Sequence, residues 1–128
     1  MDNSIIDLII RIKNGYLAKK EIIISPYSKI REAVLKKLQE LNFIKNFQIK
    51  GEKIKKIEIE LLYKEGAPAL TDVKIFSKPG RRWYVSVKHL KPVLNGLGYS
   101  ILTSPKGIIT EKEAKKLKTG GELLFQIW

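Results

Sequence analysis

Apolar residues recur at helical spacing in two stretches of the first half of the chain. Between residues 4 and 20 an isoleucine, or finally a tyrosine, returns every three or four positions, which places these side chains on one face of an α-helix. Residues 28–42 show the same period, and Ser28 stands at their start, where a serine can cap the first turn. The pattern therefore predicts two amphipathic helices.

Between and after these helices the pattern becomes that of β-strands. Residues 21–26 are rich in isoleucine and end at a proline, which is typical of a short strand. Residues 43–63 alternate apolar and polar positions on both sides of a Lys-Gly-Glu-Lys break, as in a β-hairpin with one face in water. The first half thus has the predicted order α-β-α-β-β.

The second half begins with a predicted hairpin. Residues 72–76 and 82–87 are strand-like and flank the sequence Ser-Lys-Pro-Gly-Arg. Pro79 and Gly80 occupy the two central positions that a type II turn favours. We therefore expect the two strands to pair with each other across this turn.

The remainder is predicted to contain two strands and a capped helix, with a short helical turn ahead of them. Residues 99–103 and 122–128 are strand-like, and residues 111–117 are helical. Thr110 and Glu113 have the spacing of a capping box, and a pair of glycines after this helix is expected to end it.

A stretch with glycine and proline at residues 64–70 separates the two halves and is the best candidate linker. We place the boundary after Gly66, which gives an N-terminal α/β lobe (1–66) and a C-terminal β-rich lobe (67–128). The predicted fold class is α+β in two small lobes, the first α-β-α-β-β and the second mainly β with one or two short helices.

The net charge of the chain limits the classes of partner that it is expected to bind. The chain has 25 lysines and arginines against 13 acids, a net charge of +12, which favours a polyanion such as nucleic acid, an acidic membrane or an acidic protein. The first lobe has a net charge of +5 and the second +7. Cysteine is absent, in agreement with a reducing compartment, and we expect a cytoplasmic protein. Asp7 and Arg11 interrupt the first apolar run, so we expect neither a signal peptide nor a membrane span.

Enzyme chemistry finds little support. His89 is the only histidine, and without cysteine the usual zinc ligands cannot be assembled. The aspartates are scattered, there is no glycine-rich phosphate loop, and Ser104 has no evident general base. We predict no catalytic residue, no metal site, no cofactor and no enzymatic activity.

Two motifs are candidates for nucleic-acid contact. In "KPGRRWY" (78–84) cations stand beside aromatic rings, a combination suited to phosphates and bases. A solvated hairpin tip over core aromatics explains it equally well. Alternation along a strand sends Trp83 and Tyr84 to opposite faces, and we expect Tyr84 to be the outward ring.

The second motif is "TSPKGIIT" (103–110). Its hydroxyls can bond to ribose or phosphate, Lys106 adds a charge directed at phosphate, and Gly107 permits close approach or positive φ. Taken alone, the octet favours an ordinary turn whose hydroxyls cap local amides.

The order of the motifs alters this balance. "GLGYSILTSPKGIITEKEAKK" followed by "GGELLFQIW" resembles the carboxyl-terminal signature of the small-subunit ribosomal protein eight (S-eight) family. The resemblance extends to "SKPGRRWY", "SPYSKIREAVLKKL" and "IRIKNG" and so covers nearly the whole chain. It implies a two-lobed α/β protein that binds the central domain of 16S rRNA and helps to assemble the platform of the small subunit, without catalysis.

The resemblance also implies which residues contact RNA and which partners lie nearby. The partners would be neighbouring small-subunit ribosomal proteins including protein five, with a second role on the protein's own messenger left open. The implied RNA contacts are the loop Thr103, Ser104, Pro105, Lys106 and Gly107, the supporting residues Tyr84 and Glu122, and the first-lobe residues Arg11, Lys13, Asn14, Lys29 and Arg31.

Pro105 departs from the family pattern, which usually has serine there. Proline offers neither a hydroxyl nor an amide donor, so one hydrogen bond expected from the resemblance is in doubt. Because proline also favours extended geometry at Ser104, we expect a preorganised loop. The alternatives to an RNA-binding protein are a DNA-binding architectural protein and an RNA-processing enzyme.

Overall fold

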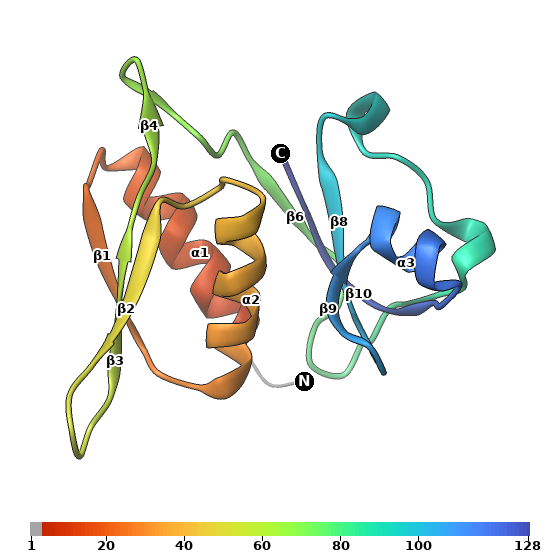
Figure 1. Ribbon diagram of the computed structural model, residues 1–128, viewed down its shortest axis with the longest axis horizontal. Coiled ribbons are helices and arrows are strands. Elements are labelled where there is room, and N and C mark those ends of the chain that lie inside the picture. Colours follow the sequence, from red (N-terminus) through yellow and green to blue (C-terminus); the bar gives the residue numbers. More distant parts are fainter. Residues whose placement is uncertain (1–3) are drawn as a thin grey trace. The chain divides into compact units, whose positions relative to one another are not determined.

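The computed structural model describes residues 4–128, which form two compact units, Ser4–Thr71 and Asp72–Trp128 (Figure 1). The division lies five residues beyond the predicted boundary at Gly66, because the candidate linker is part of the first unit. Strands β4 (Tyr63–Lys64) and β5 (Ala67–Pro68) pair antiparallel, and Gly66 forms their turn with a φ of 81°.

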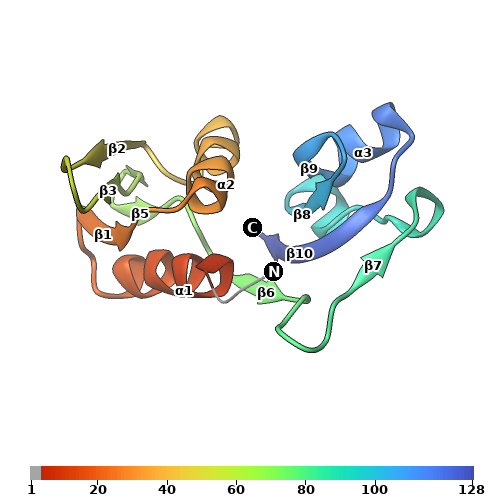
Figure 2. The same ribbon diagram turned by 90° about the horizontal axis from the view of Figure 1, so that it is seen from below.

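The first unit has the predicted α-β-α-β-β order, followed by this small hairpin. Its sheet is antiparallel with the strand order β1-β3-β2, and both helices lie against one face of it (Figures 1 and 2). The elements are α1 (Ser4–Leu17), β1 (Ile22–Pro26), α2 (Lys29–Glu40), β2 (Asn46–Lys50) and β3 (Lys56–Glu60).

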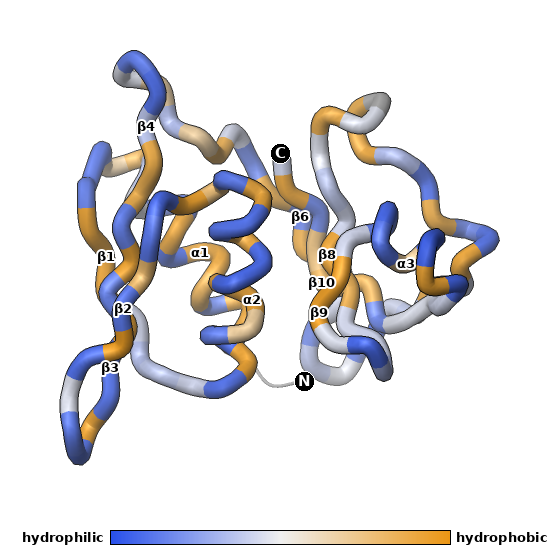
Figure 3. The backbone as a smooth tube through the Cα atoms, viewed as in Figure 1, coloured by the Kyte–Doolittle hydropathy of each residue, from blue (hydrophilic) through white to orange (hydrophobic). Residues whose placement is uncertain are grey.

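Alternation decides which side chains of this sheet enter the core. Ile57 and Ile59 of β3 are fully buried against the helices, whereas Glu58 and Glu60 face the other way. The predicted cap of α2 is confirmed, since Ser28 Oγ accepts a hydrogen bond of 3.2 Å from the Arg31 amide. Figure 3 shows how hydrophobic and hydrophilic residues follow one another within the strands and helices.

The second unit is built around β10 (Gly121–Ile127), in which five of the seven residues are buried. The strand order is β6-β10-β8-β9, with β7 also paired to β10. The other elements are β6 (Val73–Ile75), β7 (Tyr84–Val85), the 3₁₀ turns η1 (Val87–His89) and η2 (Leu94–Gly96), β8 (Tyr99–Ser104), β9 (Gly107–Thr110) and α3 (Glu111–Leu117). The predicted capping box is confirmed, because Thr110 and Glu113 exchange side-chain to backbone hydrogen bonds.

The predicted hairpin at residues 72–87 is only half right. The turn is present, since Lys78 and Arg81 exchange backbone hydrogen bonds of 3.1 and 2.9 Å and Gly80 has a φ of 78°. The flanking strands do not pair with each other, however: β6 pairs with the end of β10 and β7 with its beginning. The longer apolar strand β10 thus supplies backbone hydrogen-bond partners to both short strands. The chain runs from β6 to β7 through the Lys78–Arg81 turn (Figure 2).

The glycines after α3 have a different role from the one predicted. The helix ends at Leu117, and Lys118 takes the left-handed conformation with a φ of 53°. Gly120 and Gly121 instead allow close approach between strands, because a Cβ at Gly121 would lie 2.3 Å from the Thr103 carbonyl oxygen.

A buried carboxyl at the start of α3 makes the stability of the fold depend on pH. Glu111 is 1% exposed, and its Oε2 accepts a hydrogen bond of 2.7 Å from the Ser100 amide. Burial raises the pKa of Glu111, and the Ser100 hydrogen bond opposes that rise only in part. A carboxyl with a raised pKa stabilises the fold while protonated, and this stabilisation is lost as pH rises through the folded-state pKa.

Glu111→Gln is therefore expected to raise the free energy of unfolding at neutral pH and to leave it unchanged in acid, where the wild-type carboxyl is itself protonated. Urea unfolding over a pH series measures the difference. Glu52→Gln, at an exposed position, is the control and should follow wild type throughout. A Glu111→Gln variant less stable than wild type at neutral pH would contradict the expectation.

Candidate nucleic-acid interface

The motif at residues 103–110 forms a tight hairpin turn between β8 and β9. Ser104 and Gly107 are cross-strand partners, and Pro105 and Lys106 are exposed at the tip. Ser104 Oγ accepts a hydrogen bond of 3.1 Å from the Lys106 amide and donates one of 3.1 Å to the Gly107 carbonyl. Gly107 has a φ of 103°, which agrees with its predicted role. The turn is thus held by its own hydroxyl.

The sheet brings three of the predicted residues into one row. Glu122 of β10 lies between Tyr84 of β7 and Thr103 of β8 and pairs with both. Directly paired residues project from the same face, and two strand spacings set the outer backbones about 10 Å apart. The next pair along, Leu123 and Leu102, is buried in the core. The row therefore occupies the face away from that core.

The row combines an exposed ring with a shielded carboxylate. Tyr84 is 70% exposed, as predicted for the outward ring, but Trp83 is 43% exposed as well, so neither ring is buried. Glu122 is 9% exposed and lies 3.6 Å from Arg82, measured from Oε2 to Nη1. This oxygen has no hydrogen-bond partner within residues 4–128. The row thus presents an exposed ring at Tyr84 and a threonine at Thr103, with the carboxylate of Glu122 shielded between them.

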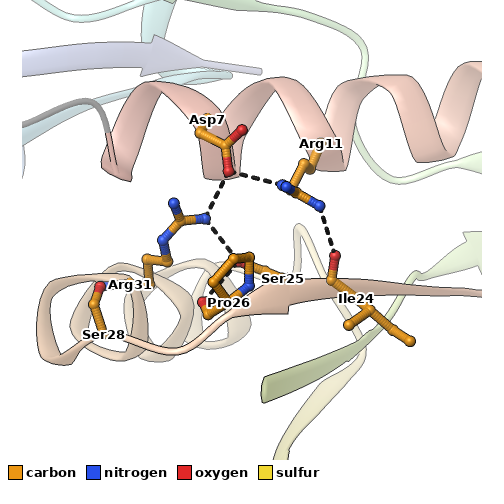
Figure 4. Close-up of polar contacts among 7 residues, drawn as sticks. All are labelled: Asp7, Arg11, Ile24, Ser25, Pro26, Ser28 and Arg31. Atoms are coloured by element: carbon orange, nitrogen blue, oxygen red, sulfur yellow. Dashed lines mark hydrogen bonds and ion pairs between the residues drawn. The ribbon is translucent and has the colours of Figure 1, made fainter. Parts of the chain in front are cut away.

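In the first unit, two of the predicted arginines share one carboxylate (Figure 4). Asp7 Oδ2 accepts hydrogen bonds of 2.8 Å from Arg31 Nη1 and 2.7 Å from Arg11 Nε. These bonds, the one from Arg31 first, hold the pKa of Asp7 below its ordinary value. Arg31 also donates to Ser25 Oγ at 2.7 Å and is only 8% exposed. The guanidinium of Arg31 therefore lies inside the unit.

The remaining first-lobe residues lie on more than one surface. Arg11 and Asn14 line a groove between α1 and β1 together with Lys20, and Arg11 Nη1 donates to the Ile24 carbonyl at 3.2 Å. Lys29 is exposed at the start of α2. Lys13 lies about 200° around the helix from Arg11. Arg11 therefore shares a groove with Asn14 and a carboxylate with Arg31. The structure does not collect all five predicted residues into one patch.

Comparison with known proteins shows the family to which the chain belongs. The family model described as ribosomal protein S8 matches residues 3–128. The chain belongs to the ribosomal protein S8 family. It is 46% identical to small ribosomal subunit protein uS8 of Brucella melitensis over 124 residues, covering 95% of this chain and 94% of that protein. It is 42% identical to uS8 of Dictyoglomus thermophilum over 125 residues, with 97% and 95% covered.

Membership of the S8 family makes this chain a structural component of the small ribosomal subunit. Its setting is the ribosome, with ribosomal RNA and other ribosomal proteins around it, and the family is structural and non-enzymatic. Within residues 4–128, no three histidine, cysteine or acidic side chains are grouped to hold a metal ion. No helix in that range is long and apolar enough to cross a membrane.

Two residues that hold β10 against its neighbours were missed from the sequence. Gly121 lets β10 approach Thr103 and Ser104, and Ser77, which is fully buried, donates to the Leu123 carbonyl at 2.8 Å. A glycine pair directly ahead of an apolar strand was a signal for close approach. Ser77 gave no comparable signal, because its partner lies 46 residues away.

Proposed function

We propose that this chain binds the central domain of 16S rRNA through the β8–β9 turn and the Tyr84–Glu122–Thr103 row, and so helps to assemble the platform of the small subunit. The observation that carries the proposal is the exposed turn, closed by its own serine, beside a polar row on the face away from the core. A preorganised turn loses little conformational entropy when it binds.

Two physical effects contribute to binding, one to affinity and the other to selectivity. The net charge of +12 attracts RNA and releases counterions on contact, which gives affinity without sequence preference. Selectivity comes from the turn, since a wide and shallow RNA minor groove presents 2′-hydroxyls and base edges to hydroxyls and backbone groups such as those of Thr103, Ser104 and Gly107. Lys106 supplies a phosphate contact at the tip.

The first unit contributes contacts to the RNA backbone in this proposal. Arg11, Asn14 and Lys29 are exposed and suit phosphate or ribose contact, as does Lys13 from its own helix face. Arg31 acts indirectly, by holding Asp7 and through it Arg11. Contact with protein five and repression of the protein's own messenger stay predictions from the resemblance. Family membership favours RNA over the DNA-binding alternative.

Ser104→Ala is expected to weaken binding to a central-domain rRNA fragment by roughly 1–3 kcal/mol, because the hydroxyl both contacts RNA and braces the turn. Its salt dependence should stay that of wild type. Lys106→Met is expected to reduce the slope of log affinity against log salt by about one phosphate contact. Fluorescence anisotropy over a series of salt concentrations measures both quantities.

Lys53→Met is the matched control, since Lys53 is an exposed lysine in the β2–β3 turn of the first unit. It should change neither the affinity nor the selectivity attributed to the β8–β9 turn. Unrelated folded RNA and duplex DNA serve as competitors. If Ser104→Ala weakened binding to unrelated RNA as much as to the central-domain fragment, the turn would not be the selective element.

A further inference from the structure

The second unit has a hollow on the opposite side of β10 from β8 and β9, near the end of β6 and the turn that follows. Three of its lining side chains are cations and two are aromatic, and none of the lining residues is acidic. They are Lys74, Ile75, Phe76, Lys78, Arg81 and Trp83. Such a combination attracts anions and offers a surface for flat rings.

Trp83 is exposed although its backbone is held on two sides. Its amide donates to Ser77 Oγ at 2.9 Å, and its carbonyl accepts from the Leu123 amide at 2.8 Å. Ser77 is fully buried and itself donates to the Leu123 carbonyl. The indole is nevertheless 43% exposed. A large apolar ring is thus presented to solvent from a backbone that is fixed against β10.

The ring is also available for stacking. Trp83 meets Phe76 in an edge-to-face arrangement, with the centroids 5.4 Å apart and the planes at 74°. At least one indole face is therefore not covered by Phe76. Lys74 lies with its Nζ 5.2 Å from the Phe76 centroid, and the Lys78–Arg81 turn is closed by two backbone hydrogen bonds. Lys74, Lys78 and Arg81 thus line the same hollow as the indole, and the backbones that carry them are held by hydrogen bonds.

We infer that this hollow binds an unpaired nucleotide of RNA, with the base stacked on Trp83 and the adjacent phosphates held by Lys78 and Arg81. Stacking on an indole accepts any base, so this contact adds affinity with little sequence preference. The inference rests on the proposed RNA binding and extends it. The second unit would hold RNA at the β8–β9 turn on one side of β10 and at Trp83 on the other.

Fluorescence of Trp83 tests the inference directly. The chain has two tryptophans, and Trp128→Phe leaves Trp83 as the only indole while keeping the backbone hydrogen bonds between Trp128 and Asp72. In this background, we expect emission to be quenched by an unstructured oligouridylate and by the central-domain rRNA fragment. Trp83→Leu should lower affinity for the fragment about 5- to 150-fold, because stacking of one base contributes about 1–3 kcal/mol. Trp83→Phe should lose less affinity, because it keeps an aromatic ring.

The outcomes separate this inference from the proposed function. Unchanged emission on RNA binding, together with wild-type affinity for a Trp83→Leu variant whose urea unfolding is normal, overturns the nucleotide site even if Ser104→Ala weakens binding. Failure of the wild-type chain to bind the fragment, with quenching by oligouridylate retained, overturns the proposed function and leaves the hollow. Quenching by a neighbouring ribosomal protein and not by RNA also counts against the inference.

Discussion

Gly121→Ala is expected to destabilise the second unit by about 2–3 kcal/mol and to abolish selective RNA binding. The added Cβ would lie 2.3 Å from the Thr103 carbonyl oxygen and 3.3 Å from the Ser104 Cβ. The first contact is with backbone, which has no rotamer to change, so β8 and β10 must move apart. That movement displaces the two residues that begin the β8–β9 turn and disturbs the Glu122–Thr103 pairing.

Urea unfolding and rRNA affinity, measured on the same preparation, check both parts of this expectation. Gly66→Ala is the control: Gly66 has a φ of 81° and no atom within 4 Å of an added Cβ. It should cost about 1 kcal/mol through backbone conformation alone and leave RNA affinity unchanged. A Gly121→Ala variant with wild-type stability and affinity would show that β8 tolerates the shift and that the close approach is not needed.

Asp7→Asn is expected to destabilise the first unit by about 1–3 kcal/mol. Removing the carboxylate deprives the Arg31 guanidinium, whose side chain is only 9% exposed, of its ionic partner, and a buried charge without its counter-charge is costly. Because the Asp7 side chain is 42% exposed, water limits the loss below that of a fully buried pair. Arg11 loses the same partner, so its side chain should become more mobile.

The pH dependence provides an independent check on Asp7. Its pKa is lowered in the folded state, so its stabilisation is full above the pKa of the unfolded chain and disappears as pH falls through the folded-state pKa. Wild type should therefore lose stability in acid more steeply than Asp7→Asn. Glu60→Gln is a matched control, since the Glu60 side chain is 44% exposed and pairs with the exposed Lys45 at 3.4 Å. It should change stability by less than about 1 kcal/mol. Equal losses for the two variants would refute the special role of Asp7.

Local patterns predicted the elements with few errors. The period of the isoleucines in α1, the Ser28 cap and the Thr110–Glu113 capping box all appear as expected. The turn at Pro79–Gly80 and the positive φ of Gly107 follow from the same kind of reasoning. Each depends on groups only a few residues apart, whose geometry one turn of chain already determines.

The site was predicted unevenly for the same reason. The resemblance picked out the β8–β9 turn together with Tyr84 and Glu122, but nothing local could tell that these residues stand in one row. Basic residues of the first unit were grouped because they are charged. Yet Arg31 points inward to Asp7 and Ser25, which became visible only with α1, β1 and α2 packed together.

By itself, the sequence determined the two-part α+β plan, the caps, the turns and the basic character that suits RNA, since these depend on side-chain type and short spacings. Only the tertiary structure decided that β6 and β7 both pair with β10, that Gly121 must be glycine, that Arg31 is buried and that Trp83 is exposed in a cationic hollow. These features depend on which distant segments become neighbours, and neighbours are chosen by the packing of the whole core.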